Sequence, residues 1–437
     1  MADVLCSVGL DVGTTTTQLI VSQLTVENQA SAFSVPRMAI TNRKILYKSP
    51  IHFTPLLGGE RVDGDGIRQI VLKEYEAAGI RREQVDTGAV IITGETSRKE
   101  NAKAVLASLS DFAGDFVVAT AGPDLESVLA AKGSGAVERS ENTTVLHMDI
   151  GGGTSNLALI QDRKIVQTGC MNVGGRLVKI QDGRISYISP VLDGLTELRV
   201  GDRPSQAQIT AIAQTLAQAL EMVAGLRQPT ELLNRLATRE TGQPLHPMPA
   251  EVISFSGGVA DCIENIHPLT AFGDLGPALG QAIRRSRLCQ GAYFLGKETI
   301  RATVIGAGCH SAQLSGSTVF YRNVTFPLKN LPVVTLGQTR DTDAVVVAME
   351  GIPSASYAQV AQLAEEILEK IPHGAVYLVM EQDMAKALGQ ALALRMEPSR
   401  PLLCLDRLQL GSGDYLDVAA PIGPALPVVI KTLVFSQ

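Results

Sequence analysis

Several features that would assign this chain of 437 residues to an obvious class are missing from its sequence. It has no run of about eighteen apolar residues, the length that a membrane-spanning helix needs, so no membrane partner is expected. Its net charge of −6 argues against a nucleic-acid-binding protein, which would carry basic patches or a basic net charge. Residues 1–5 lead almost directly into a strand pattern, without the basic and apolar regions of a signal peptide, so we expect a cytoplasmic location.

Cysteine and histidine are also sparse and scattered. None of the six cysteines forms a Cys-x-x-Cys pair, and in a cytosolic chain this spacing predicts reduced, mostly buried thiols. The six histidines include no His-Glu-x-x-His zinc signature. The remaining composition, 45% hydrophobic and 19% charged, is that of an ordinary globular protein. Its length is typical of about two to three domains.

The order of the patterns predicts an α/β fold. A nearly continuous apolar strand at residues 4–10 is followed by a turn and a second strand at 18–23. A helix is expected at 65–78, with Asp65 as its N-cap, and further helices at 97–112 and 124–132 alternate with strands. Residues 1–140 are therefore expected to form one α/β domain.

The opening pattern occurs a second time. A strand at 145–148, the turn Asp149-Ile150-Gly151-Gly152-Gly153-Thr154 and a returning strand at 156–160 repeat the strand, turn and strand around Asp11. A long helix at 206–224 and a strand at 252–255 follow, so a second domain is expected at 141–312. Residues 313–437 are expected to form a third, C-terminal α/β region, with Pro-rich stretches at 327–332 and 421–427 acting as linkers or bends.

The two turns have a composition suited to phosphate. Glycine lets the backbone approach an anion without a Cβ clash, and convergent N–H groups form an anion-binding concavity. Asp11 and Asp149 would repel phosphate alone, but fit if Mg²⁺ or an attacking water lies between carboxylate and phosphate. An ordinary hairpin turn is the alternative for either copy, and the repetition favours phosphate binding. A third turn, Ser256-Gly257-Gly258, follows a strand and would let a flat ring and ribose lie against backbone.

In this order, the three turns resemble those of the actin, DnaK-type chaperone and sugar-kinase ATPase superfamily. The resemblance implies two lobes built from duplicated ribonuclease H-like domains, with ATP and Mg²⁺ clamped between them. It assigns metal binding to Asp11 and Asp149, and catalysis to these two and to Asp124, with Glu126 as the alternative acidic member of the first connecting helix. The expected nucleotide-binding residues are Gly13, Thr14, Thr15, Thr16, Gly151, Gly152, Gly153, Thr154, Gly257, Gly258 and Gly306.

Two further segments narrow the resemblance. Residues 93–101, Thr-Gly-Glu-Thr-Ser-Arg-Lys-Glu-Asn, and residues 428–433 look like those of ethanolamine ammonia-lyase reactivating factors, a family similar to this chain over essentially its whole length. The resemblance implies an ATP-dependent chaperone that releases damaged cobalamin from the lyase so that intact adenosylcobalamin can bind. It implies the lyase as partner and leaves homo-oligomer formation and association with the ethanolamine microcompartment open.

Three uses of the nucleotide are compatible with the sequence. The sequence offers no obvious cation for the charge that develops in phosphoryl transfer, so slow ATP hydrolysis is expected. Arg98 and Lys99 are the candidates by position for the lysine that DnaK-type chaperones carry near the reacting phosphate. A small-molecule kinase of the same superfamily is the alternative, and an actin-like filament protein is the third class.

Overall fold

The computed structural model describes most of the chain, in two compact units. The described residues are 3–13, 16–28, 38–57, 61–93, 116–120, 123–238, 245–310, 312–314, 319–337, 344–408, 410, 414–418, 421 and 426–432. Unit 1 takes residues 1–91, 99–120 and 311–435, whereas unit 2 takes 92–98, 121–310 and the last two residues. Within the described ranges no helix is both long and apolar enough to cross a membrane.

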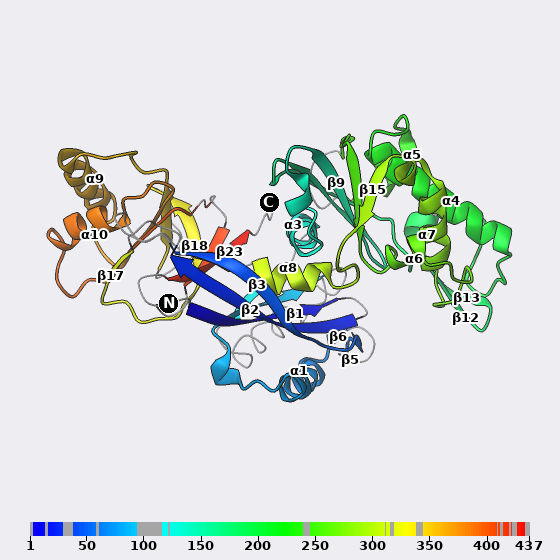
Figure 1. The fold of residues 1–437 in the computed structure, drawn as a ribbon, viewed down its shortest axis with the longest axis horizontal. Coiled ribbons are helices and arrows are strands. Elements are labelled where there is room, and N and C mark those ends of the chain that lie inside the picture. Colours follow the sequence, from blue (N-terminus) through cyan, green and yellow to red (C-terminus); the bar gives the residue numbers. More distant parts are fainter. Residues whose placement is uncertain are drawn as a thin grey trace. The chain divides into compact units, whose positions relative to one another are not determined.

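Unit 1 contains a sheet formed by the first part of the chain (Figure 1). Its strands β1 (Asp3–Val12), β2 (Thr16–Asn28), β3 (Met38–Lys48), β7 (Thr87–Ile92) and β8 (Phe116–Thr120) lie in the order β3-β2-β1-β7-β8. Strand β4 (His52–Phe53) pairs with β2, and β5 (Leu56–Leu57) pairs with β6 (Arg61–Val62). The predicted helix 97–112 lies outside the described residues.

Helix α1 (Gly64–Ala78) confirms the helix expected at this position, but begins earlier than expected. Asp63, not Asp65, is its N-cap, and the Asp63 carboxylate accepts a hydrogen bond from the backbone N–H of Gly66. Asp65 instead lies in the first turn, where a negative charge interacts favourably with the helix dipole. The helix ends at Gly79, which adopts the left-handed conformation with φ of 68°.

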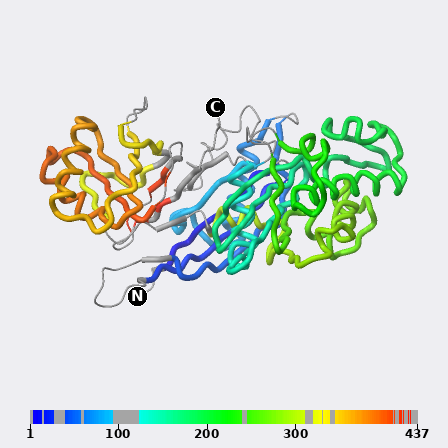
Figure 2. Tube along the Cα trace, turned by 90° about the horizontal axis from the view of Figure 1, so that it is seen from above, coloured from blue at the N-terminus to red at the C-terminus, as the bar shows by residue number. Residues whose placement is uncertain are grey.

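The C-terminal part of unit 1 contains an eight-stranded sheet. The strands are β16 (Ala312–Leu314), β17 (Phe320–Arg322), β18 (Leu328–Thr335), β19 (Val346–Met349), β20 (Val376–Met380), β21 (Leu402–Asp406), β22 (Asp414–Val418) and β23 (Pro427–Thr432). Their order is β16-β23-β22-β18-β19-β20-β21-β17. Helices α9 (Tyr357–Lys370) and α10 (Ala385–Ala393) pack against the core of this sheet, and Figure 2 shows the yellow to orange chain as one compact group.

One expectation for this region was wrong. Residues 327–332 were expected to be a linker or bend, but residues from Leu328 onward belong to β18. Pro332 lies opposite Tyr415 of β22, and an irregularity between Leu328 and Leu331 accommodates the change of register. Pro332 therefore lies within the strand, just after this irregularity, and the stretch is not a linker.

Unit 2 repeats the strand order of the first sheet. Its strands β9 (Thr144–Ile150), β10 (Ser155–Gln161), β11 (Lys164–Met171), β14 (Val252–Ser256) and β15 (Ala292–Leu295) lie in the order β11-β10-β9-β14-β15. In both sheets, the first three strands in sequence form an antiparallel meander. Two later strands, β7 and β8 in unit 1 and β14 and β15 in unit 2, join beyond the first strand. The expected duplicated α/β architecture is therefore confirmed.

Helices cover both faces of the unit 2 sheet. Helices α4 (Gln206–Val223) and α7 (Gly276–Arg285) share a core with Leu146, Met148 and Ile150 of β9. On the other face lie α3 (Pro123–Gly133) and α8 (Ala302–His310), which pack closely on each other (Figure 1). Because side chains alternate along a strand, His147 and Asp149 of β9 point to this second face.

The remaining elements are short. Strands β12 (Val178–Gln181) and β13 (Arg184–Ile188) form a hairpin. The short helices are α5 (Glu231–Leu236), α6 (Asp261–Glu264) and the 3-10 turns Arg82–Gln84, Glu138–Ser140, Pro190–Leu192 and Arg287–Cys289. All six cysteines lie within the described residues; none of them forms a disulfide, and all but Cys6 are buried, as expected. The three-domain division at residues 140 and 312 stays a proposal.

Candidate functional site

The two glycine turns have matching geometry. In the first, the Gly13 N–H donates to the Thr16 carbonyl at 2.9 Å, and in the second the Gly151 N–H donates to the Thr154 carbonyl at 2.9 Å. Each acidic residue also occupies the same ladder position, because Asp11 lies opposite Gln18 and Asp149 lies opposite Asn156. The repeat seen in the sequence is therefore a repeat of one hairpin.

The first turn is supported by a residue that the sequence did not single out. The Thr54 hydroxyl donates to the Gly13 carbonyl at 2.7 Å and lies 3.1 Å from the Thr17 hydroxyl. Strand β4 places Thr54 here by pairing with the start of β2. The predicted phosphate-binding residues Thr14 and Thr15 lie outside the described residues.

The second turn is held by a later part of the chain. The Gly175 N–H donates to the Gly151 carbonyl at 3.0 Å, and the Arg176 N–H donates to the Gly152 carbonyl at 2.6 Å. In the described part of the chain, no hydrogen bond engages the N–H groups of Gly152 and Gly153. A Cβ on Gly153 would meet nothing within 4 Å. The turn therefore keeps two donors and open space on one side, which suits an anion.

Asp149, at the end of β9, is the buried acid of this turn and is only 8% exposed. Its Oδ1 accepts a hydrogen bond from the Ser256 hydroxyl, and its Oδ2 lies 3.5 Å from the Thr303 hydroxyl on α8. Burial raises the pKa of Asp149 to about 6, although the two hydroxyl contacts act in the opposite direction. Near pH 7 the carboxylate is mostly ionised, and Oδ2 has the weaker protein contact.

A buried histidine lies beneath this acid. His147 is fully buried, with Nε2 3.0 Å from the Ser256 hydroxyl and Nδ1 3.0 Å from the Ser254 hydroxyl. Burial lowers the pKa of His147 to about 3, so the ring is neutral. Because the Ser256 hydroxyl donates its hydrogen to Asp149, its oxygen accepts a hydrogen bond from His147 Nε2–H. The other ring nitrogen of His147, Nδ1, then accepts from the Ser254 hydroxyl. The chain of hydrogen bonds thus runs in one direction, toward the carboxylate.

The third predicted turn lies beside the second. Gly257 has a φ of +85°, and a Cβ there would overlap the carbonyl oxygen of Ile150. The Val259 N–H donates to the same carbonyl at 3.1 Å. The position therefore requires glycine for close backbone approach. Gly258 has open space, with the Ile300 side chain 3.8 Å from an added Cβ.

The structure places the remaining predicted residues on α3 and α8. The Asp124 carboxylate accepts from the Thr168 hydroxyl at 2.5 Å, and the Glu126 carboxylate accepts from Asn156, the ladder partner of Asp149, at 2.7 Å. Gly306 packs against α3, where a Cβ would overlap the carbonyl oxygen of Leu129. Helix packing accounts for glycine at this position, and the ligand roles of Asp124 and Gly306 stay predictions.

The donor set at the second turn fits Mg²⁺. This ion takes oxygen ligands, and proteins hold it through one or two carboxylates together with phosphate oxygens and water. Asp149 supplies such a carboxylate beside donors suited to phosphate. Over the described ranges, no group of three or more His, Cys, Asp or Glu side chains forms a metal centre. An ion at this turn would depend on phosphate and water for its other ligands.

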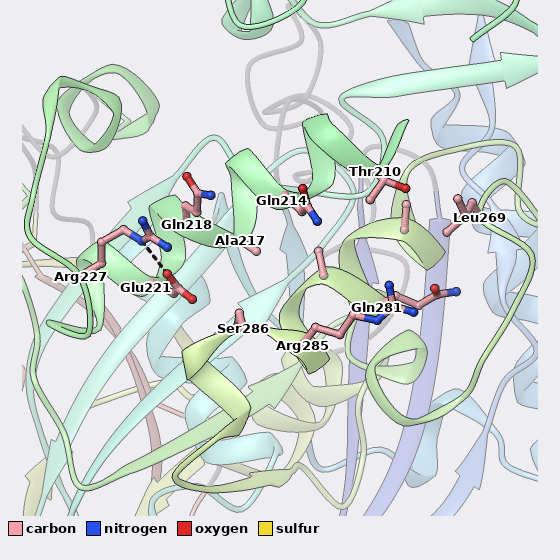
Figure 3. A pocket seen from close by; sticks show the side chains of 12 residues that line it. Thr210, Gln214, Ala217, Gln218, Glu221, Arg227, Leu269, Gln281, Arg285 and Ser286 are labelled. Atoms are coloured by element: carbon pink, nitrogen blue, oxygen red, sulfur yellow. Dashed lines mark hydrogen bonds and ion pairs between the residues drawn. The ribbon is translucent and has the colours of Figure 1, made fainter. Parts of the chain in front are cut away.

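A separate pocket of about 290 Å³ lies between α4 and α7 (Figure 3). Thr210, Gln214 and Gln218 line it from α4, whereas Gln281 and Arg285 line it from α7. Its lining includes none of the predicted site residues. It is therefore distinct from the glycine turns.

Comparison with known proteins identifies the family. The family described as "Ethanolamine utilisation protein EutA" matches residues 3–344 and 335–436. The chain belongs to this family. The "Ethanolamine ammonia-lyase reactivase EutA" of Salmonella typhimurium (strain LT2) is 37% identical over 470 residues, covering 99% of this chain and 98% of that protein. The protein of the same description from Escherichia coli (strain K12) is 37% identical over 467 residues, with the same coverage.

Two solved structures have a more distant similarity to this chain. The Aquifex aeolicus member of the Ppx/GppA family has a TM-score of 0.44 and 12% identity, covering 70% of this chain and 97% of that chain. The ethanolamine utilization protein EutJ from Carboxydothermus hydrogenoformans has a TM-score of 0.35 and 16% identity, covering 69% of this chain and 88% of that chain.

Proposed function

We propose that this chain is an ethanolamine ammonia-lyase reactivase, which uses ATP to release damaged cobalamin from the lyase so that intact adenosylcobalamin can bind. The observation that carries the proposal is the 37% identity, over 99% of the chain, to two curated reactivases. The alignment with these two proteins spans the C-terminal sheet as well as the glycine turns. The lyase is the proposed partner, and association with the ethanolamine microcompartment is part of the proposal.

The nucleotide would be bound through the second glycine turn. The N–H groups of Gly152 and Gly153, with the Thr154 hydroxyl, are suited to phosphate oxygens, while Gly257 and Gly258 leave room for backbone contact with the nucleoside. Mg²⁺, when bound, would neutralise phosphate charge and orient a phosphate oxygen. Asp149 would hold the ion or its water through Oδ2, since Ser256 fixes the orientation of the carboxylate through Oδ1.

The first turn has the same hydrogen bond and the same acidic position, and we propose the same chemistry for it. Asp11 would bind Mg²⁺ or its water, and Gly13, Thr14, Thr15 and Thr16 would bind phosphate. Thr54 would keep the Gly13 carbonyl turned away from the anion by donating to it. ATP and ADP must favour different conformations of the protein if hydrolysis is to drive exchange in the lyase.

A phosphate-release assay with and without lyase tests the proposal. Purified protein, ATP and Mg²⁺ should release phosphate slowly, and ethanolamine ammonia-lyase blocked with cyanocobalamin should accelerate the release. Asp149→Asn should abolish both rates, whereas Asp162→Asn, the same change in an exposed turn, should leave them intact. A small-molecule kinase would be favoured if the rate of ATP consumption did not respond to blocked lyase but depended on an added metabolite with a hydroxyl group. No feature of the described site supports that alternative.

A further inference from the structure

Arg176 contacts the second glycine turn through a backbone hydrogen bond and through its side chain. Its N–H donates to the Gly152 carbonyl at 2.6 Å, so the residue cannot move independently of the turn. Its aliphatic stem lies over Gly152, since a Cβ added there would be 3.2 Å from the Arg176 Cδ. The side chain therefore begins beside the donors that suit a phosphate chain.

The guanidinium group is only partly used by the protein. Its Nε lies 3.5 Å from Oδ2 of Asp274, a long distance for an ion pair, and the Arg176 side chain is 35% exposed. The other oxygen of Asp274 accepts from the Gly276 N–H at 2.8 Å, so this carboxylate also serves the start of α7. In the described part of the chain, no other acceptor is bonded to the guanidinium, which has five N–H donors in all.

We propose that Arg176 is the cation that binds the phosphate chain of the nucleotide at the second glycine turn. The inference rests on the nucleotide-binding function proposed above and supplies the positive charge that the sequence lacked near the turn. A planar guanidinium offers paired donors that match two phosphate oxygens. Asp274 holds the guanidinium at the turn before the nucleotide binds. Because the contact with Asp274 is long, replacing it by a contact with phosphate costs little free energy.

A purely structural ion pair is the competing explanation, and it makes a different prediction for the two partners. If the pair only stabilises the fold, Arg176→Met and Asp274→Asn both break it and should have similar effects. If Arg176 binds phosphate, the two changes should act in opposite directions. Removing Arg176 removes the phosphate contact, whereas Asp274→Asn keeps the oxygen for Gly276 and removes a negative charge that competes for the guanidinium.

Isothermal titration of ATP with Mg²⁺, ADP and adenosine into the full-length protein measures these effects. Arg176→Met should weaken ATP binding by roughly tenfold to a hundredfold, the range expected for a charge-assisted contact, and leave adenosine binding nearly unchanged. Arg176→Lys should recover part of the loss, and Asp274→Asn should bind ATP at least as tightly as the wild type. Arg163→Met is the control, because it removes one exposed arginine paired with Glu141 at the far end of the β10–β11 hairpin.

The outcomes separate this inference from the proposed function. If the wild-type protein binds ATP, and Arg176→Met weakens that binding while Asp274→Asn does not, the inference is supported. If the wild-type protein binds ATP but Arg176→Met leaves the affinity unchanged, or both variants weaken it equally, the inference is overturned while nucleotide binding stands. A wild-type protein that binds no nucleotide overturns both.

Discussion

Asp149→Asn should make the protein more stable while abolishing its function. Burial raises the pKa of this carboxyl from 3.8 to about 6, so ionising it within the fold costs free energy. Each pKa unit corresponds to about 1.4 kcal/mol, which gives a cost of about 3 kcal/mol once both states are ionised. Asparagine keeps an oxygen for the Ser256 hydroxyl and a polar group for Thr303, and carries no charge.

The sign of the effect depends on pH. The folded protein keeps the Asp149 proton between pH 3.8 and about 6, where the unfolded chain has lost it, so this residue reduces stability as pH rises through that range. The increase in the free energy of unfolding caused by Asp149→Asn should therefore be largest above about pH 7 and become smaller toward pH 4. For a unit of this size, about 3 kcal/mol corresponds to a rise in Tm of roughly 6–12 °C.

Differential scanning calorimetry at pH 8 and at pH 5 measures the effect. Because the chain has two compact units, each transition should be followed separately. Asp162→Asn, in an exposed turn, makes the same chemical change without relieving any burial and should leave Tm unchanged. A Tm for Asp149→Asn that is unchanged or lower at pH 8, or a gain equally large at pH 5, would refute the account of this buried charge.

Substitutions at three other positions and a change of pH give separate tests. Gly257→Ala should destabilise the protein by several degrees in Tm, because a Cβ would overlap a backbone carbonyl at positive φ, whereas Gly153→Ala should leave Tm unchanged and weaken ATP binding measured by titration. Thr54→Val should weaken ATP binding about fivefold by removing the hydroxyl that donates to Gly13, and Thr54→Ser should restore it. Affinity for Mg²⁺-ATP should fall as pH drops below about 6, because protonation removes the charge of Asp149.

The sequence predicted the duplicated hairpins correctly because their signal is local. A strand, an acidic residue and a glycine turn follow one another within about ten residues, and the ladder partners Asp11 with Gln18 and Asp149 with Asn156 confirm the pattern. The end of α1 at Ala78 was likewise predictable, because helices commonly end before a glycine, and Gly79 here adopts the left-handed conformation. Its start was not, because Asp63 and Asp65 are both good caps and only the chain geometry chooses between them.

The parts that the sequence did not predict depend on contacts between distant segments. Arg176 reaches Gly152 only because β11 returns to the turn, and Thr54 reaches Gly13 only because β4 pairs with β2. The hydroxyl of Ser256 meets Asp149 because β14 runs parallel to β9, and no local pattern reveals that pairing. Pro332 was misassigned to a linker because proline usually marks a break, whereas here it lies opposite Tyr415 within a strand pair.

Recovery of blocked lyase is the direct measure of the proposed reactivase function. Ethanolamine ammonia-lyase inactivated with cyanocobalamin would be incubated with the purified protein, ATP, Mg²⁺ and adenosylcobalamin, and deamination of ethanolamine would then be followed. We expect recovery with wild-type protein to require ATP and to be lost with Asp149→Asn, although that variant is folded. Recovery without ATP, or undiminished recovery with Asp149→Asn, would contradict ATP-driven reactivation through Asp149.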